Sequence, residues 1–363
     1  MRWILPLLGS QVAAVTVDDD ASLRAALAAA RPGAEIVVKA GDYRGGIHVK
    51  DRPGTAERPI VLRAEGKVTL RGGGSTAIQW SACPHWTVKG LGAEGFTGNG
   101  FNLDDAGRRD QPVAGVRLEG LVVRRTGPRG NHDGIKMSGL VDFVVKDCLI
   151  EGWGGSGIDM VGCRDGEVEG CVLRGLDGHD QMSGIQMKGG TRNVRVTGCR
   201  FEDAGLRAVN LGGSTGEAYF RPSVTRFEAT AIEISDNVFV GGQTAVAFVT
   251  ADGGKMRHNL ILRPTKWAFR ILQEQPVPEF GACRGGEISR NVIVLPEGNR
   301  VAVNVGPHTD PQSFVIRENA WFHEGGRHRP ALPVEEDDGI HGVDPMVRDG
   351  RVTSARLRDF GPR

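Results

Sequence analysis

One short motif recurs along the chain and constrains its fold more than any other feature. In all copies but one, a small residue precedes an apolar, a polar and another apolar residue, as in Gly134–Met137 (GIKM) and Gly157–Met160 (GIDM); Ala245–Phe248 (AVAF) has Ala at the polar position. Alternation with a period of two is typical of a short β-strand that buries one face. The copies used here are Ala77–Trp80, Gly100–Leu103, Gly134–Met137, Gly157–Met160, Gly184–Met187, Ala208–Leu211, Ala245–Phe248, Ala268–Ile271 and Ala302–Val305.

A second recurring position lies between these copies and sets the length of the repeat. It runs from Leu91 to Asn319 with a mean spacing of about 28 residues. Two strands per period predict a solenoid of parallel strands, because each coil buries its apolar residues on its neighbours. The leucine spacing of leucine-rich repeats and the aromatic signature of propeller blades are both absent. We therefore predict an all-β fold, a right-handed parallel β-helix of about ten coils.

The second recurring position also predicts what fills the interior. Its members are Leu91, Leu121, Cys148, Cys171, Cys199, Asn237, Asn259, Asn291 and Asn319. Stacked Asn side chains can hydrogen-bond along the axis of the solenoid. The three cysteines are most simply read as small buried hydrophobic residues.

The ends of the chain differ from the repeat. Ser22–Ala30, followed by Arg31-Pro32-Gly33, is predicted to form a short helix that caps the first coil. We assign residues 21–325 to the capped β-helix and residues 326–363 to an irregular segment that packs on it. Residues 1–20 are read as a secretory signal peptide or a disordered tail, since a short apolar run precedes small residues.

The net charge and the hydropathy of the chain argue against two kinds of interaction, general nucleic-acid binding and crossing a membrane. The 45 basic and 44 acidic residues give a formal net charge of +1, whereas a general nucleic-acid binder usually has a basic excess. The longest apolar run near the start, Trp3–Leu8, is too short to cross a bilayer. We expect a monomer with no nucleic-acid partner and no membrane span, in a secreted or periplasmic location.

Residues 22–74 resemble the opening of a known group of enzymes. The segments SLRAALAAARPGAEIVVKAGDY and RPIVLRAEGKVTLRGG are similar to the start of the chondroitinase B and alginate lyase group of polysaccharide lyases. Similarity to the wider superfamily of secreted right-handed β-helix proteins extends to about residue 322. The resemblance implies a carbohydrate substrate. The Glu-x-Lys-Ser type segment that supplies calcium ligands and a catalytic lysine in that group is missing, so its catalytic residues are not carried over.

The polar residue of each motif points outward in the predicted fold. The outward residues form a ladder that can bind an extended sugar chain: Gln79, Asn102, Lys136, Asp159, Gln186, Asn210, Ala247, Arg270 and Asn304. Lys188 lies on the same face, two residues after Gln186. From this ladder we expect Gln186, Asn210 and Arg270 to bind substrate. Arg221, on the inserted segment 212–222, is expected to pair with a substrate carboxylate.

These residues suit β-elimination on an acidic (uronic-acid-containing) polysaccharide. The reaction needs a base for the C5 proton, a neutraliser for the carboxylate and a proton for the leaving O4 oxygen. Candidate catalytic residues are Lys136, Lys188, His132 and Arg207, with Tyr219 as a proton donor to the leaving oxygen. If calcium (Ca²⁺) neutralises the carboxylate, the expected ligands are Asp133, Asp159 and Asp180.

Three alternatives stay open at this point. Asn131–Gly134 (NHDG) resembles the Asn-Thr-Asp-Gly element of β-helix polygalacturonases, and Asp133 with Asp159 could serve as a carboxylate pair for a glycoside hydrolase. A C5-epimerase shares the proton abstraction with a lyase. A non-catalytic glycan-binding module would use the same groove without a working base.

Overall fold

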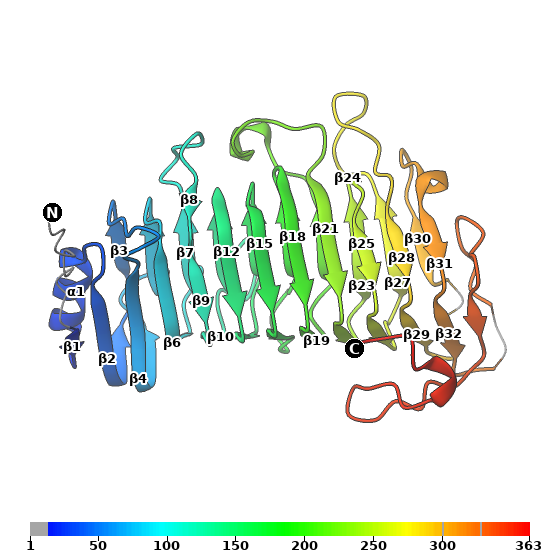
Figure 1. Ribbon diagram of the computed structural model, residues 1–363, viewed down its shortest axis with the longest axis horizontal. Coiled ribbons are helices and arrows are strands. Elements are labelled where there is room, and N and C mark those ends of the chain that lie inside the picture. Colours follow the sequence, from blue (N-terminus) through cyan, green and yellow to red (C-terminus); the bar gives the residue numbers. More distant parts are fainter. Residues whose placement is uncertain (1–13, 300, 327–328) are drawn as a thin grey trace, which may run out of the picture.

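The chain winds into successive coils whose strands stack side by side along the molecule (Figure 1). The pairings between coils form three series, which we describe as three faces. The computed structural model describes residues 14–299, 301–326 and 329–363. Within these residues every pairing between strands of neighbouring coils is parallel, for example between β11 (Ile135–Ser138) and β14 (Ser156–Val161). The repeat thus forms the predicted parallel β-helix.

The first face is built from the recurring motif. Its inward residues, such as Ile135, Met137, Ile158 and Met160, are fully buried, as the alternation requires. Across the described ranges the face has ten strands: β3 (Ile47–Lys50), β5 (Ile78–Ser81), β7 (Phe101–Asp104), β11, β14, β17 (Ser183–Lys188), β20 (Arg207–Gly212), β23 (Thr244–Val249), β27 (Trp267–Leu272) and β30 (Val303–Val305).

The other two faces meet at the position that recurs between the motifs. The second face contains β8 (Val113–Ala114), β9 (Arg117–Glu119), β12 (Leu140–Lys146), β15 (Arg164–Glu169), β18 (Thr191–Thr197), β21 (Ala229–Ser235), β24 (Ala251–Asp252), β25 (Lys255–Arg257), β28 (Glu287–Ser289) and β31 (Val315–Arg317). The third contains β10 (Val122–Arg124), β13 (Leu149–Glu151), β16 (Val172–Arg174), β19 (Arg200–Glu202), β22 (Val238–Val240), β26 (Leu260–Leu262), β29 (Val292–Leu295), β32 (Ala320–His323) and β33 (Ile340–His341). In the first coils β2 (Glu35–Arg44), β4 (Ile60–Arg71) and β6 (Trp86–Glu94) run through both faces.

A helix caps the first coil, as predicted. Helix α1 (Asp20–Ala29) buries Leu23 and Leu27 against the coil below. It begins two residues earlier than expected because Asp19 is its N-cap: the Asp19 carboxylate accepts a 2.7 Å hydrogen bond from the Ser22 backbone N–H. Strand β1 (Val15–Val17) pairs with β2. The rest of the predicted signal or tail, residues 1–13, lies outside the described residues.

The four asparagines form a continuous buried ladder. Each of Asn237, Asn259 and Asn291 donates from Nδ2 to Oδ1 of the next Asn, at 2.9–3.0 Å. Asn319 then donates at 2.9 Å to Glu336, which comes from the C-terminal segment. All four asparagines are fully buried, so the ladder satisfies polar groups that water cannot reach.

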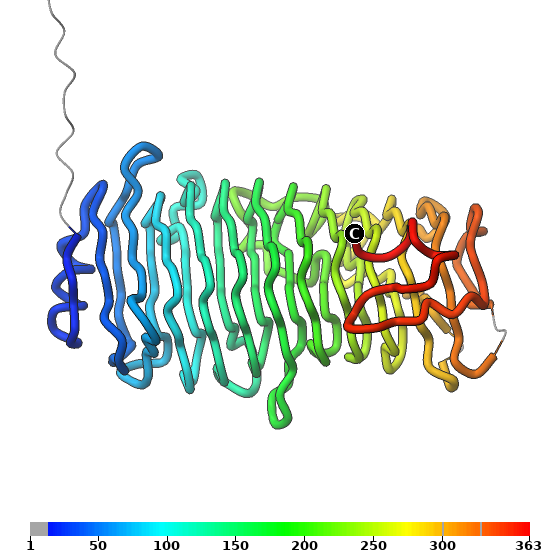
Figure 2. The backbone as a smooth tube through the Cα atoms, turned by 60° about the horizontal axis from the view of Figure 1, so that its bottom comes forward, coloured from blue at the N-terminus to red at the C-terminus, as the bar shows by residue number. Residues whose placement is uncertain are grey.

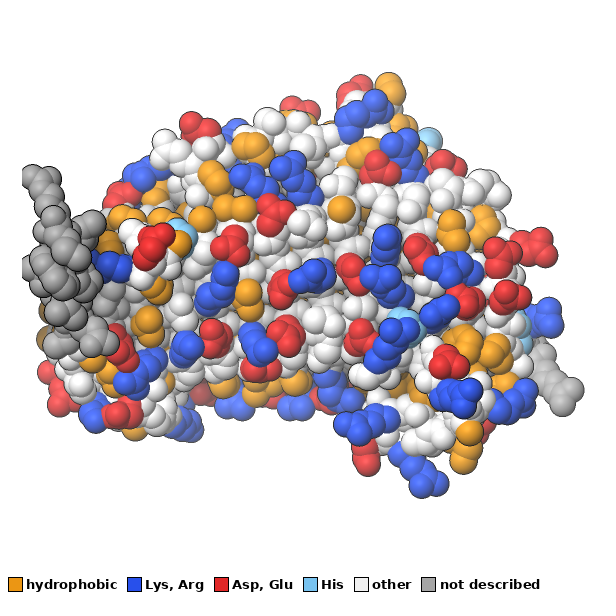
Figure 3. Space-filling view, viewed as in Figure 1, with side chains coloured by type: hydrophobic (Ala, Val, Ile, Leu, Met, Phe, Trp, Pro, Cys, Tyr) orange, Lys and Arg blue, Asp and Glu red, His pale blue; other side chains and the backbone are white. Residues whose placement is uncertain are grey.

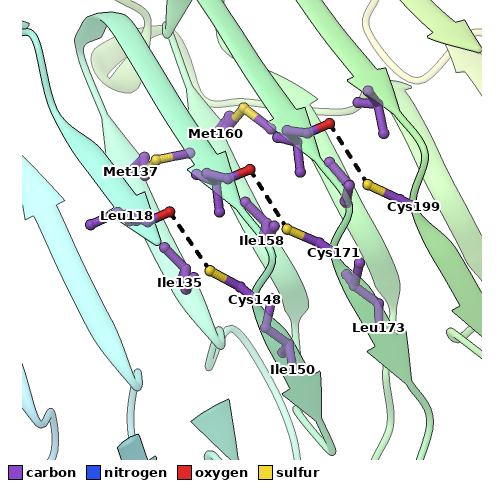
Figure 4. Close-up of a cluster of buried hydrophobic side chains, with 14 of the residues drawn as sticks. Leu118, Ile135, Met137, Cys148, Ile150, Ile158, Met160, Cys171, Leu173 and Cys199 are labelled. Carbon is purple, nitrogen blue, oxygen red and sulfur yellow. Dashed lines mark hydrogen bonds between the residues drawn. The ribbon is translucent and has the colours of Figure 1, made fainter. Parts of the chain in front are cut away.

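The three cysteines occupy the same column in earlier coils (Figure 4). Each thiol bonds weakly to main-chain oxygens, for example Cys171 Sγ to Val145 O at 3.6 Å. All three are free and buried. The turn before Cys171 and Cys199 has a glycine with φ near +60° (Gly170 and Gly198), a conformation that other residues adopt less readily. This explains the recurring Gly-Cys pairs.

The C-terminal segment lies along the last coils (Figure 2). Strand β33 extends the third face beside β32, and Leu357 and Phe360 pack on outward apolar residues such as Leu260 and Val292. Short 3-10 turns lie at Glu217–Tyr219, Pro311–Ser313 and Ala355–Leu357. In the part of the chain that the structure describes, no helix has both the length and the apolar character to cross a membrane.

Candidate active site

The second face is covered by exposed ion pairs. Lys89, Glu119, Lys146 and Glu169 follow one another on neighbouring coils, with Nζ–O distances of 2.8 Å (Lys89–Glu119) and 3.0 Å (Lys146–Glu169). Figure 3 shows positive and negative side chains mixed across the side seen in Figure 1. Exposed pairs of this kind contribute little and are typical of a solvated surface. The fully buried carboxylates Asp133 and Asp159, by contrast, belong to the first face.

The first face carries its outward side chains in register. Lys136 is paired with Asp159 and Asp159 with Gln186, the order that the repeat predicts. Gly46–Val49 has the same motif and adds His48, which the sequence prediction overlooked by starting at Ala77. The whole row is His48, Gln79, Asn102, Lys136, Asp159, Gln186, Asn210, Ala247, Arg270 and Asn304.

Lys136 and Asp159, at the centre of this row, meet two further charged side chains, Asp133 and Lys188, and the four alternate in sign. Lys136 Nζ lies 2.9 Å from Asp133 Oδ2 and 2.5 Å from Asp159 Oδ2. Asp159 Oδ1 in turn lies 3.3 Å from Lys188 Nζ. Both carboxylates are fully buried, whereas the lysine side chains are about one-fifth exposed, at 21% and 18%. The two ammonium groups therefore face the solvent side of the cluster, and the carboxylates lie beneath them.

Burial and the neighbouring charges shift the pKa values of Lys136 and Asp133. Burial by itself lowers the pKa of Lys136, but the charges of Asp159 and Asp133 outweigh it and hold that pKa well above its ordinary value. Burial, reinforced by repulsion from Asp159, raises the pKa of Asp133. Lys136 is therefore a fixed ammonium ion at neutral pH.

Backbone and amide groups hold Asp133 in place. Its Oδ1 accepts a 2.7 Å hydrogen bond from the Ser156 N–H, and its own N–H donates to Asn99 Oδ1 at 2.8 Å. Neither Ser156 nor Asn99 was predicted to take part in the site. Both contact Asp133 because neighbouring coils bring together residues that are more than twenty positions apart in the sequence.

Two clefts meet at Lys188. We call the first the arginine cleft; it holds about 360 Å³ and its lining includes Ser156, Gln186, Arg207, Asn210, Arg270 and Glu274. We call the second the tyrosine cleft; it holds about 330 Å³ and its lining includes Lys136, Ser138, Val161, Thr215, Tyr219 and Arg221. Lys188, Asn131 and Ser214 line both clefts. An extended chain that occupies both would therefore pass over Lys188.

The inserted segment forms the wall of the tyrosine cleft. The buried Glu228 carboxylate accepts hydrogen bonds from the N–H groups of Gly189 and Thr215, both at 2.6 Å. Farther along, Phe220 packs on Phe280 with ring centroids 5.8 Å apart. Anchored at both points, the segment is a fixed wall, and Tyr219 at its tip is 66% exposed.

Arg221 also anchors this wall. Its Nε donates to Asp105 Oδ2 at 2.6 Å, in a pair with side chains only 13% and 1% exposed. Its Nη1 donates to the backbone oxygens of Tyr219 and Phe220. The guanidinium predicted to bind a substrate carboxylate is thus paired with an internal carboxylate and positions Tyr219.

Two other predicted residues lie outside both clefts. The His132 ring packs against Gly127, its Nδ1 is buried without a hydrogen-bond partner among the described residues, and it lines neither cleft. Asp180 is exposed on the loop after β16, where its N–H bonds to Pro128 O at 2.8 Å. Neither side chain joins the cluster of Lys136, Asp133 and Asp159.

The carboxylates do not fit the predicted calcium site. Among the residues that the structure describes, no group of three or more His, Cys, Asp or Glu side chains could hold a metal ion. The ammonium of Lys136 lies between Asp133 and Asp159, in the position that a cation shared by these two carboxylates would need. Asp180 is not brought to them.

The described residues define a parallel β-helix with a polar, partly cationic groove on one face. A family model described as "Right handed beta helix region" matches residues 76–265, more than half of the chain. The chain belongs to this right-handed β-helix family, which confirms the predicted handedness. A search of curated protein sequences finds no match.

Solved structures of polysaccharide-active proteins share the fold. An alginate lyase from Paenibacillus sp. str. FPU-7 is 18% identical, with a TM-score of 0.54 over 82% of this chain and 96% of its own. A PL6 family polysaccharide lyase from Pseudopedobacter saltans is 14% identical, with a TM-score of 0.57 over 96% and 98%. An endo-xylogalacturonan hydrolase from Aspergillus tubingensis is 10% identical, with a TM-score of 0.52 over 91% and 100%. The recognised resemblance is thus confirmed at the level of the fold.

Proposed function

We propose that this protein is a secreted or periplasmic polysaccharide lyase that cleaves a uronic-acid-containing polysaccharide by β-elimination. The observation that carries the proposal is the position of Lys188. Its amine lies at the junction of two clefts on the outward face, above a buried carboxylate. A base at the centre of an extended groove is what proton abstraction from an internal sugar unit requires.

β-Elimination needs one group that takes a proton and one that gives a proton, and we propose that side chains of the protein supply both. The base takes the C5 proton, the C5–H electron pair forms the C4–C5 double bond, and the C4–O4 bond breaks with its electrons leaving on oxygen. The leaving oxygen then receives a proton. The products are a shortened chain and a chain whose new end carries an unsaturated uronic acid.

The two lysines suit different roles. Lys136 is clamped by two buried carboxylates, and its raised pKa keeps it charged. We assign it to electrostatic stabilisation of the negative charge that develops as the C5 proton leaves and that spreads onto the adjoining carboxylate, together with the amides of Gln186 and Asn210. Lys188 has one carboxylate contact, at 3.3 Å, and lines both clefts, so we assign it as the base.

Tyr219 is the proposed proton donor to the leaving oxygen. It is exposed on the wall segment and lines the tyrosine cleft together with Lys136 and Lys188. A phenol can donate to a leaving oxygen without carrying a charge into the site. The internal pair of Arg221 and Asp105 holds the backbone that carries this phenol.

The buried carboxylates argue against hydrolysis by Asp133 and Asp159. Both are fully buried and bind the same Lys136 Nζ, so neither reaches a sugar in the groove. A hydrolase needs both carboxyl groups beside the scissile bond, with room for water in the inverting case.

The proposal is tested by incubation with a panel of uronic-acid polymers. An increase in ultraviolet absorbance from a conjugated double bond supports elimination, and new reducing ends without absorbance would move the function to hydrolysis. An exchanged C5 proton without cleavage would identify an epimerase. Because Lys136 lies where a shared metal would lie, we expect elimination to continue after chelation; loss of activity that calcium restores would contradict this.

A further inference from the structure

The end of the arginine cleft away from Lys136 contains two guanidinium groups. Arg207 and Arg270 both line the cleft, and the side chain of Arg207 is 20% exposed. Glu274 pairs with Arg207 Nη2 at 2.6 Å and supplies the one carboxylate of the described cleft lining. The two arginines with one glutamate therefore leave one positive charge at this end.

Arg270 is held with its outer nitrogens available. Its guanidinium lies over the Trp267 ring, 4.4 Å from the centroid, and its Nε donates to Asn304 Oδ1 at 3.0 Å. Within the described residues nothing bonds to its Nη1 or Nη2. Burial, followed by the charge of Arg207, lowers the pKa of Arg270 from its ordinary value, as expected for cations close together in a partly dry site.

We propose that Arg207 and Arg270 form a second carboxylate-binding subsite, so that the substrate carries uronic acids on the β27 side of the scissile bond as well as at it. A planar guanidinium matches a carboxylate through two parallel hydrogen bonds. The subsite assumes the proposed function and deepens it, because it selects acidic oligomers over isolated uronic acids.

The spacing supports an oligomeric ligand. The strand of Arg270 is three strands from that of Lys188 along the first face, through β20 and β23, which is about 14 Å between the two strands at the usual separation. A single sugar at Lys188 does not span that distance, whereas an extended chain in the arginine cleft does. Ala247, on β23 between the strands of Arg207 and Arg270, has a small apolar side chain and offers no competing hydrogen bond to a carboxylate bound there.

The test is a binding measurement that does not depend on turnover. Calorimetry would compare tetragalacturonate and tetramannuronate with their carboxyl-reduced counterparts, on the full chain carrying Lys188→Ala so that ligand is not consumed. Arg270→Gln in this background is expected to weaken binding of an acidic tetrasaccharide about tenfold or more. Binding of the reduced, neutral tetrasaccharides should not change.

Lys266→Gln is the matched control. Lys266 also lies over the Trp267 ring, at 5.6 Å, and its loss removes the same charge, but it does not line the cleft. It should leave affinity unchanged. Equal effects of the two substitutions, equal affinity for acidic and reduced sugars, or no binding of either acidic tetrasaccharide would overturn the subsite.

The experiments distinguish an error in the subsite proposal from an error in the proposed reaction. If Arg270→Gln weakens acidic binding but no polymer yields an unsaturated product, the subsite stands and the lyase assignment falls. If unsaturated product forms and Arg270→Gln changes neither affinity nor KM, the reaction stands and the subsite falls.

Discussion

Lys188 Nζ lies 3.3 Å from Asp159 Oδ1, across neighbouring coils of the first face. The other oxygen of Asp159 is bound at 2.5 Å by Lys136. One buried carboxylate thus orients two lysines with different surroundings, one clamped between two carboxylates and one open to both clefts. This asymmetry separates the base from the fixed charge in the proposed reaction.

Replacing Lys188 with alanine tests the assignment of the base. We expect kcat for elimination to fall by about 10²- to 10⁴-fold, the range that a positioned base contributes. The melting temperature should change little, because Asp159 keeps its closer partner Lys136. Lys89→Ala, on the second face, is the control for loss of a lysine. Full activity of Lys188→Ala would transfer the role of base to another residue.

Tyr219→Phe separates proton donation from packing. Without the hydroxyl, kcat should fall by about 10²-fold while KM stays nearly the same, since the ring is retained. Tyr219→Ala should also raise KM if the ring contacts sugar. A Phe variant as active as the parent, measured by the initial rate of absorbance change, would mean that Tyr219 is not the donor.

Removing Lys136 should destabilise the fold far more than removing an exposed lysine. Lys136→Met leaves buried Asp133 without its ion-pair partner and buried Asp159 with only the longer contact to Lys188, at a cost of about 3–5 kcal/mol in unfolding free energy. Lys146→Met breaks a solvent-exposed pair with Glu169 and should lower the unfolding free energy far less than Lys136→Met. Urea unfolding monitored by circular dichroism measures both. Similar costs would mean that the buried cluster is not tightly paired.

The stability difference between the parent and Lys136→Met is also expected to depend on pH. The pKa of Lys136 is raised above its ordinary value of 10.5, so its stabilisation is fully present below pH 10.5 and is lost as pH rises through the higher folded value. The stability difference between the parent and Lys136→Met should therefore be constant from neutral pH to about 10.5 and shrink only above it. A difference that already shrinks near pH 8 would contradict the raised pKa.

Substituting one rung of the asparagine ladder should be costly. Asn259 Oδ1 accepts from both N and Nδ2 of Asn237, and its Nδ2 donates to Asn291. Asn259→Leu leaves these groups buried without partners, so we expect a loss of about 3 kcal/mol or more. Cys171→Ala, in the same column, removes only weak thiol contacts and should cost about 1 kcal/mol. The urea midpoints of the two variants compare them directly.

The repeat alone predicts the coils, the order of outward residues and the inward column of cysteines and asparagines. These features depend on local alternation, which a β-strand converts directly into inward and outward side chains. One miss was avoidable: Gly46–Val49 carries the full motif, and His48 belongs to the row. The helix start was missed by two residues because Asp19 precedes the apolar pattern that marks the helix.

The arrangement around the row was decided by the tertiary structure. Arg221 meets Asp105, 116 residues earlier, and Arg207 meets Glu274, 67 residues later. Arg221, Asp105 and Glu274 lie in loops, which have no period, so the sequence did not indicate these pairings. It also placed His132 and Asp180 beside the cluster, whereas packing against Gly127 and exposure on a loop keep them out of it. The sequence by itself determined which residues face outward in which coil, because that follows from a period of two. Only the folded chain decided which outward charges pair with one another and which remain open to a ligand, because that depends on contacts between distant loops and coils.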